Sequence, residues 1–227
     1  MRLQDFAQQN TPKEGGDVFQ IENSKILEVK LNGKVMAKAG SMISYTGDVS
    51  FERKEAGGLK GFLKKAATNE GSVTMEASGQ GYLYLADNGK KVQVLQLGRG
   101  EKLSVNGNDI LAFEEKINWD IETIGSLAGS ASGGLFNVTL EGPGYIAITT
   151  HGDPLVLPTP VTTDPDATVA WSGNVSPNMK TDIGIKGFLG RNSGESFQLD
   201  FTGDQGFVVV QPFEEQQPQS GGSNQPI

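Results

Sequence analysis

The sequence contains no cysteine among its 227 residues. Disulfide bonds, thiolate metal sites and a cysteine nucleophile are therefore excluded. Histidine is almost as scarce, because His151 is the only one, and it lies beside Gly152 in a turn-like context. Ser41 lacks the glycine two positions later that a nucleophile elbow requires. We therefore expect a loop role for His151, no catalytic residue, no bound metal ion and no cofactor.

Long apolar runs are also missing, since no segment approaches the roughly 18 residues of a membrane-spanning helix. The first residues lack the apolar core of a signal peptide and are neither arginine-rich nor poor in acidic residues. We therefore expect a soluble, cytoplasmic protein. Basic residues are outnumbered, 19 against 27 acidic ones, which gives a net charge of −8. This charge repels a phosphate backbone and disfavours nucleic acid as a partner.

Glycine is abundant, with 31 residues, about twice its usual share of roughly 7%. Many of these glycines separate short apolar runs, as is typical of a turn-rich β-protein. One block, with two expected strands joined by a glycine-rich turn, occurs three times, at 71–85, 134–147 and 194–209. The copies start about 60 residues apart, so an internal repeat determines the expected fold.

A second repeated feature is an aromatic ring that follows a small residue. Tyr45, Phe113 and Trp171 occupy the same place in three stretches that align without gaps. Aromatic rings contribute strongly to core burial, so we expect all three in the core; a ligand-stacking role is the alternative. Asn32-Gly33, between two alternating apolar runs, predicts a β-hairpin.

These patterns predict an all-β, single-domain protein built from three β repeats related by a pseudo-threefold axis. The repeats would close into a barrel or prism, because one such unit alone has too little core. We expect a flexible N-terminal arm over 1–17, a β domain over 18–213, and a disordered tail over 214–227, where Gln, Ser, Gly and Pro dominate. The repeats would span about 18–70, 71–133 and 134–213, with strand exchange between them possible.

Two glycine-flanked loops are the candidate interaction site. They combine apolar side chains with lysine and arginine, as do loops that rest on an anionic membrane surface or dock on a protein. The alternative is that these loops only cover one end of the barrel. The candidate residues are Leu59, Phe62, Leu63, Lys64, Lys65, Phe188, Leu189 and Arg191.

The order of several short motifs resembles the altered-inheritance-of-mitochondria protein 24 family, in its bacterial branch. The similarity runs from about Val18 to Pro212. It implies a fold like that of the tryptophan RNA-binding attenuator protein, of the double-stranded β-helix type. Mitochondrial members of the family are linked to inner-membrane organisation, and the family brings no catalytic residues to carry over. The motifs are Ala39-Gly40-Ser41-Met42, Gly61-Phe62-Leu63, Gly79-Gln80-Gly81, Leu111-Ala112-Phe113, Gly142-Pro143-Gly144 and Gly194-Glu195-Ser196-Phe197.

The function expected from the sequence is that of a non-enzymatic scaffold or interaction protein. Its partner would be a protein that the sequence does not name, or a second copy of the chain, because barrel-edge strands offer pairing surfaces. Peripheral contact with a membrane is a further expectation. Two alternatives stay open at this point: a β-barrel that binds a small ligand or RNA, and an enzyme.

Overall fold

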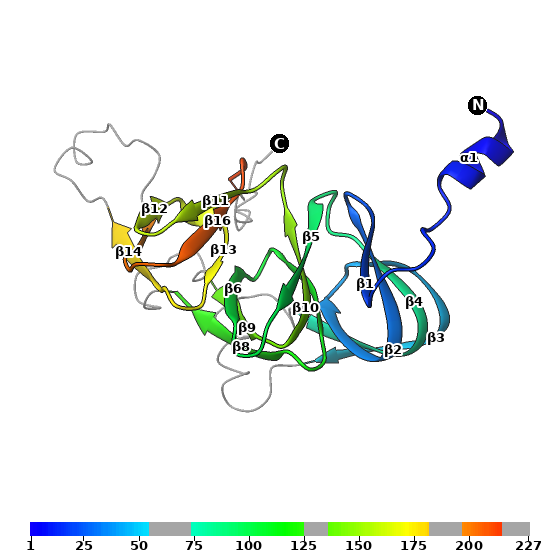
Figure 1. Ribbon diagram of the computed structural model, residues 1–227, viewed down its shortest axis with the longest axis horizontal. Coiled ribbons are helices and arrows are strands. Elements are labelled where there is room, and N and C mark those ends of the chain that lie inside the picture. Colours follow the sequence, from blue (N-terminus) through cyan, green and yellow to red (C-terminus); the bar gives the residue numbers. More distant parts are fainter. Residues whose placement is uncertain (55–73, 125–135, 182–196, 215–227) are drawn as a thin grey trace, which may run out of the picture.

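Antiparallel β-strands make up nearly all of the regular secondary structure in the computed structural model, which describes residues 1–54, 74–124, 136–181 and 197–214. The strands form three sheets, so the expectation of a mainly β protein is confirmed. Figure 1 shows that they follow the chain along the long axis of the molecule, with β1 to β4 at one end and β11 to β16 at the other.

The first sheet has seven strands in the order β3-β4-β2-β7-β10-β5, with β1 paired to β2. It joins all the strands of the N-terminal end to three strands from the middle of the chain. Its members are β1 (Phe19–Asn23), β2 (Ile26–Lys38), β3 (Met42–Lys54), β4 (Thr74–Leu85), β5 (Lys91–Leu97), β7 (Ile110–Glu114) and β10 (Gly144–Thr150).

The second sheet has six strands in the order β11-β16-β13-β6-β9-β8, and the third has three in the order β12-β15-β14. The second sheet comprises β6 (Lys102–Asn106), β8 (Asn118–Thr123), β9 (Phe136–Glu141), β11 (Leu155–Pro158), β13 (Thr168–Ser172) and β16 (Phe207–Val210). The third sheet comprises β12 (Val161–Thr163), β14 (Pro177–Thr181) and β15 (Phe197–Phe201).

Two short helices complete the described chain. One is a 3-10 turn, η1 (Pro165–Ala167), capped by the carboxylate of Asp164, which accepts a hydrogen bond from the backbone N–H of Asp166 at 2.7 Å. The other is α1 (Leu3–Gln9), all of whose residues are exposed. This helix lies in the N-terminal arm, residues 1–17, for which the sequence predicted a flexible segment.

Three hydrophobic clusters lie one after another along the molecule. The first cluster, near the N-terminal end, includes Leu27, Leu83 and Ala112. The second, in the middle, includes Phe113, Ile146 and Ala170, and the third, near the C-terminal end, includes Trp171 and Phe201. Successive residues of a strand point to opposite faces of its sheet. Strands β7 and β13 therefore each contribute to two neighbouring clusters.

The glycines of the first repeated block do not form the expected turn. Strand β4 runs unbroken through Gly79-Gln80-Gly81, and β2 likewise runs unbroken through Asn32-Gly33, so both hairpin predictions are wrong. The two glycines adopt positive φ values of 128° and 152°, and the paired strand β3 lies close beside them. A Cβ atom on Gly81 would overlap the carbonyl oxygen of Thr46. Glycine is needed here for close strand approach rather than for a turn.

The corresponding glycines of the second block also have a different role. The chain leaves β9 in the second sheet before Gly142 and enters β10 in the first sheet at Gly144. Because β9 and β10 pair with different strands, this segment is a corner between sheets and not a hairpin.

Replacing Gly81 with alanine is expected to lower the free energy of unfolding by about 1–3 kcal/mol, because the new methyl group meets backbone at a positive φ. The matched control is Gly33→Ala, which also has a positive φ but no heavy atom within 4 Å of the added Cβ. Urea denaturation of both variants measures the difference. Equal losses of stability would show that close contact with β3 is not what requires Gly81.

Candidate interaction surface on strand β3

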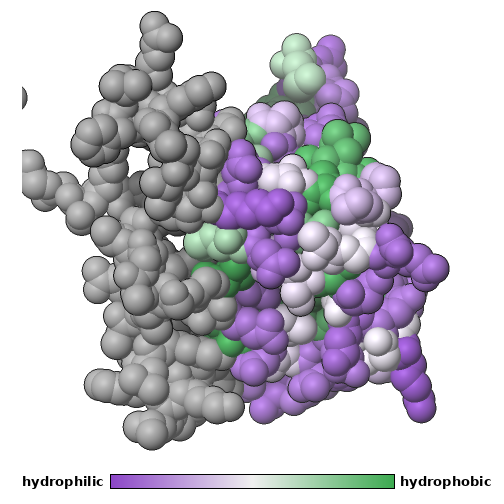
Figure 2. Space-filling model, turned by 90° about the vertical axis from the view of Figure 1, so that its left-hand side faces the viewer, coloured by the Kyte–Doolittle hydropathy of each residue, from purple (hydrophilic) through white to green (hydrophobic). Residues whose placement is uncertain are grey.

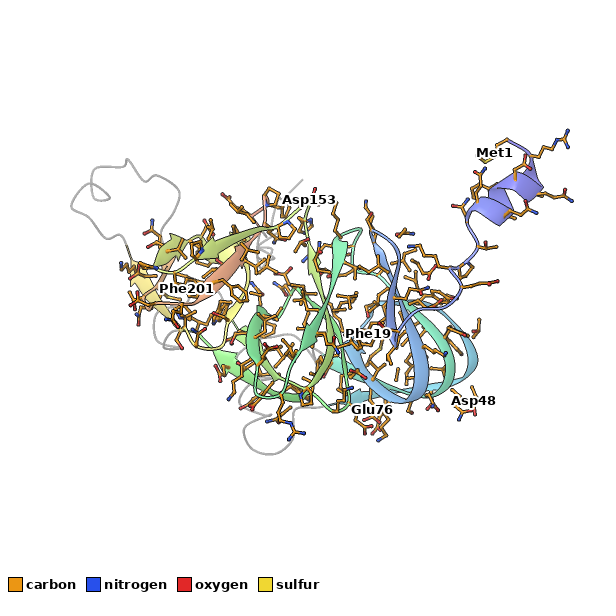
Figure 3. The ribbon with its side chains drawn as sticks, in the orientation of Figure 1. Met1, Phe19, Asp48, Glu76, Asp153 and Phe201 are labelled. Carbon is orange, nitrogen blue, oxygen red and sulfur yellow. The ribbon has the colours of Figure 1, made fainter. Side chains whose placement is uncertain are left out.

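Strand β3 forms one edge of the first sheet. It pairs with β4 on one side, and no other strand of the described chain pairs with its opposite side. Large apolar side chains are exposed along it: Met42 (38%), Ile43 (53%), Tyr45 (45%) and Phe51 (36%). We call the surface formed by these four residues and the exposed Ser44 the β3 edge. Figure 3 places Asp48, on the same strand, at the outer margin of this sheet.

The two aromatic rings of the β3 edge pack on each other. The ring centroids of Tyr45 and Phe51 are 5.4 Å apart at an interplanar angle of 69°, an edge-to-face contact. A second ring pair joins Phe113 of β7 and Trp119 of β8, with centroids 5.6 Å apart and a tilted interplanar angle of 57°. Phe113 is only 1% exposed, so a ring pair at the matching position is covered in the middle of the chain and open on β3.

The three repeated aromatic residues have matching strand partners. Tyr45 lies opposite Leu83, Phe113 opposite Ile146, and Trp171 opposite Val208. In each case the register shifts at the residue two positions before the ring, which is Ile43, Leu111 or Val169. A shift at the same place in three strands is a recurring local feature of the kind produced by β-bulges.

Burial separates Tyr45 from the other two rings. Phe113 and Trp171 are 1% and 3% exposed, as expected from the sequence, but the prediction that Tyr45 lies in the core is wrong. The reason is the number of neighbouring strands. Strand β7 lies between β2 and β10, and β13 lies between β6 and β16, whereas β4 is the one strand that pairs with β3 among the described residues.

A tyrosine with a perturbed pKa lies next to the β3 edge. Tyr84 of β4 is opposite Ser44 of β3 and Glu28 of β2. Burial, a side-chain hydrogen bond with Glu28 and the negative charge of that carboxylate raise the pKa of Tyr84 to about 12. The hydroxyl of Tyr84 therefore interacts with Glu28 on β2, on the side of β4 that faces away from β3.

The eight residues that the sequence singled out all fall outside the described part of the chain. They are Leu59, Phe62, Leu63, Lys64, Lys65, Phe188, Leu189 and Arg191. The hypothesis that they form one apolar and basic patch is therefore left as a prediction.

A cluster of charges that the sequence did not reveal lies between the N-terminal and middle strands. Lys90 donates to Asp109 at 2.8 Å, and Lys38 donates to Asp87 at 2.8 Å. Thr149 donates to the same oxygen of Asp87 at 3.2 Å. Asp87, Lys90 and Asp109 are 5%, 5% and 0% exposed. Two lysines neutralise two carboxylates. Their ion pairs join the turn at 87–90, between β4 and β5, to the end of β2 and to the turn before β7.

The remaining candidates for chemistry have structural contacts. The ring of His151 stacks on Phe213 with centroids 4.1 Å apart, and the hydroxyl of Ser41 donates to the backbone carbonyl of Lys38 at 2.8 Å. Glu114 accepts a hydrogen bond from the backbone N–H of Tyr145 at 2.7 Å. Within the described ranges, no group of three or more histidine, aspartate or glutamate residues is placed to hold a metal ion. Nor does any helix in those ranges have the length and apolar character needed to cross a bilayer.

The sequence held one signal for the β3 edge. Small apolar residues, Ala112 and Ala170, precede the buried rings, whereas polar Ser44 precedes Tyr45. That difference is consistent with one strand facing solvent where its two counterparts are covered. The charge cluster carried no comparable signal, because Asp87-Asn88-Gly89-Lys90 has the composition of an ordinary exposed turn.

Comparison with known proteins places this architecture in a family. A crystal structure of protein SPYM3_0169 from Streptococcus pyogenes has a similar fold, with a TM-score of 0.67 and 22% identity, covering 86% of this chain and 92% of that one. No curated protein matches the chain. The family model described as mitochondrial biogenesis AIM24 matches residues 19–213. The chain therefore belongs to the AIM24 family.

Proposed function

We propose that the protein is a non-enzymatic scaffold or interaction protein that docks a partner strand along the β3 edge. The observation that carries this proposal is the exposure of Tyr45 (45%), against 1% for Phe113 at the matching position of β7. An edge strand presents unpaired backbone groups, and exposed aromatic side chains beside them supply apolar contact area. Together these features suit strand addition by a partner.

The finer architecture belongs to the same proposal. The chain would consist of three related β repeats of the double-stranded β-helix type, at about 18–70, 71–133 and 134–213. The pseudo-threefold closure into one barrel or prism that the sequence predicted would require the free edges of β3 and β12 to meet, and these lie at opposite ends of the long axis. The matching strand partners of Tyr45, Phe113 and Trp171 support the repeats. If the repeats are related, β3 would pair with a partner strand in the same way as β7 pairs with β2 and β13 pairs with β6.

Other expectations from the sequence stay predictions. Contact with a membrane surface rests on Phe62, Leu63 and the neighbouring lysines, which lie outside the described chain. A cytoplasmic location, a ligand-binding or RNA-binding barrel and an enzymatic activity have no further support from the described contacts.

Replacing Ile43 and Tyr45 together with lysine is expected to abolish association of the chain with its partner, because two charges would be placed on the docking surface. Charged edge residues are a common natural protection against strand addition. Affinity capture from native cells identifies bound proteins, and sedimentation of the purified chain measures self-association. Both readouts should fall to background in the double variant.

The matched control is the double variant Leu155→Lys with Val156→Lys. These residues are 58% and 57% exposed on β11, which is also an edge strand. The control adds the same charge to a similar edge and should leave association unchanged. Equal behaviour of the two double variants in both readouts would contradict a docking role for the β3 edge.

A further inference from the structure

Two internal junctions of the chain are built in the same way. At the first, β2 pairs antiparallel with β7, placing Met36 opposite Phe113 and Ala37 opposite Ala112. At the second, β6 pairs antiparallel with β13, placing Ser104 opposite Trp171. At each junction, a strand of one repeat (β2 or β6) pairs with a strand of the next repeat (β7 or β13), and the second strand carries the repeated aromatic ring.

The two junctions also agree in register. Val35, Leu103 and Val161 match one another, because they lie opposite Ala77, Leu140 and Phe201, each of which is two residues before the matching glycine of a repeated block, Gly79, Gly142 or Gly203. Counting from these positions, Met36 and Ser104 match Thr162. The strand that corresponds to β2 and β6 in the C-terminal segment is therefore β12.

Each junction produces six strands in a row. The second sheet joins β8, β9 and β6 to β13, β16 and β11, three strands on each side of the junction. The third sheet has only the first half of this arrangement, β14-β15-β12, and ends at β12 within the described chain. At the other end of the molecule, β3, β4 and β2 are long enough to take part twice. One part of β2, Val35–Ala37, pairs with β7 in the first junction, whereas the parts around Tyr45, Leu83 and Val29 match the second half, which ends at β3 within the described chain.

The two open edges cannot meet within one chain. Figure 1 places β12 and β3 at opposite ends of the long axis. Figure 2 looks onto the end that carries β12 and β14, where hydrophilic residues cover most of the described surface and hydrophobic residues form small patches among them. On this end, Thr162 is exposed and donates a hydrogen bond to Asp200 at 2.8 Å, and Lys180 contacts the same carboxylate at 2.7 Å.

We propose that the partner of the β3 edge is β12 of a second copy of this chain, paired antiparallel with Thr162 opposite Tyr45, Thr163 opposite Ser44 and Val161 opposite Thr46. This inference rests on the proposed docking role of β3. The pairing continues the rule of the two internal junctions and completes a third six-stranded sheet, β14-β15-β12 with β3-β4-β2. It places Tyr45 between two strands, as Phe113 and Trp171 already are.

The contact joins two different edges, so it is heterologous. Each copy that uses its β3 edge still presents β12, and the copy that uses β12 still presents β3. Such contacts close into a ring when the rotation between copies permits it and otherwise extend into a filament. We therefore expect oligomers larger than a dimer, except where two copies close a two-membered ring through two such contacts.

The absence of cysteine permits a direct test by disulfide cross-linking. One preparation carries Ser44→Cys, another carries Thr163→Cys, and the two are mixed under mild oxidation. Opposed residues of antiparallel strands have Cα atoms about 4.5–5.5 Å apart, within the range that a disulfide bridges. We expect a covalent dimer on a non-reducing gel from the mixture and from neither preparation alone.

Two control pairs calibrate this result. Ala37→Cys with Ala112→Cys, at the matching internal positions, should form a disulfide within one chain. Ser44→Cys mixed with Thr162→Cys should not cross-link, because a shift of one residue turns the side chain to the other face. Equal cross-linking of the shifted pair would overturn the proposed register.

Other outcomes separate this inference from the docking role itself. Dimers from Ser44→Cys alone would show that β3 meets β3, and would overturn pairing with β12. A wild-type chain that sediments as a monomer at all concentrations would also overturn it. If such a monomeric chain still loses a captured protein when Ile43 and Tyr45 become lysine, the docking role stands and only the second copy is excluded as partner.

Discussion

Phe113→Ala is expected to lower the free energy of unfolding by about 3–5 kcal/mol, whereas Tyr45→Ala should cost about 1 kcal/mol or less. The two rings occupy matching positions and have matching strand partners, Ile146 and Leu83. Phe113 is nevertheless 1% exposed and belongs to the second hydrophobic cluster, so its removal leaves a cavity. Tyr45 is 45% exposed, and the space left by its ring is open to water.

Urea denaturation at low protein concentration measures both changes, since dilution removes any contribution from contact between copies. Phe113→Leu provides a second variant if the alanine protein does not fold, and should lose less stability because it leaves a smaller cavity. Equal losses for Phe113→Ala and Tyr45→Ala would contradict the edge position of β3. A large loss for Tyr45→Ala only at high concentration would instead indicate that assembly buries this ring.

Asp109→Ala is expected to destabilise the fold by about 3–5 kcal/mol, because it removes the carboxylate that Lys90 contacts at 2.8 Å in a buried site. Asp109 is fully buried, and Lys90 is 5% exposed, so the lysine cannot easily recover its contacts with water. Thermal and urea denaturation at neutral pH measure the loss.

The control for this variant is Asp153→Ala, which removes an ion pair of similar length, 2.7 Å to Lys91, from a carboxylate that is 86% exposed. Its effect should stay within about 0.5 kcal/mol. The double variant Asp109→Leu with Lys90→Met should regain much of the stability, because it removes the buried ammonium together with the carboxylate nearest to it. If the double variant is no more stable than Asp109→Ala, the cost of burying the ammonium without that carboxylate is not the cause.

The sequence predicted the strand-rich fold and the family, because short apolar runs, turn glycines and three similar blocks are all local patterns. It did not predict how glycine would be used. Gly79 and Gly81 fit a hairpin turn by composition. Their actual role, which is to let the paired strand β3 lie close to β4, depends on a tertiary contact that local sequence does not show. The prediction that Tyr45 is buried was wrong for a similar reason. Its burial depends on whether a second strand lies beside β3, and the residues near Tyr45 in the sequence do not show this.

The candidate site was the least predictable part. Apolar and basic composition predicted an interaction site in loops such as Gly58–Lys65, which the structure does not describe. The β3 edge is identified by the sheet neighbours of Tyr45, Phe113 and Trp171, since Tyr45 alone is exposed among these three matching rings. The charge cluster of Lys90 and Asp109 was equally hidden, because nothing in a turn sequence shows whether another segment will cover it.

The division of strands β7 and β13 between neighbouring clusters has a consequence for how the molecule melts. Ala112 packs in the first cluster and Phe113 in the second, while Ala170 packs in the second and Trp171 in the third. Detaching either strand would open two interiors to water at once. The three segments are therefore thermodynamically coupled, and heat should unfold them in one cooperative transition rather than in successive steps.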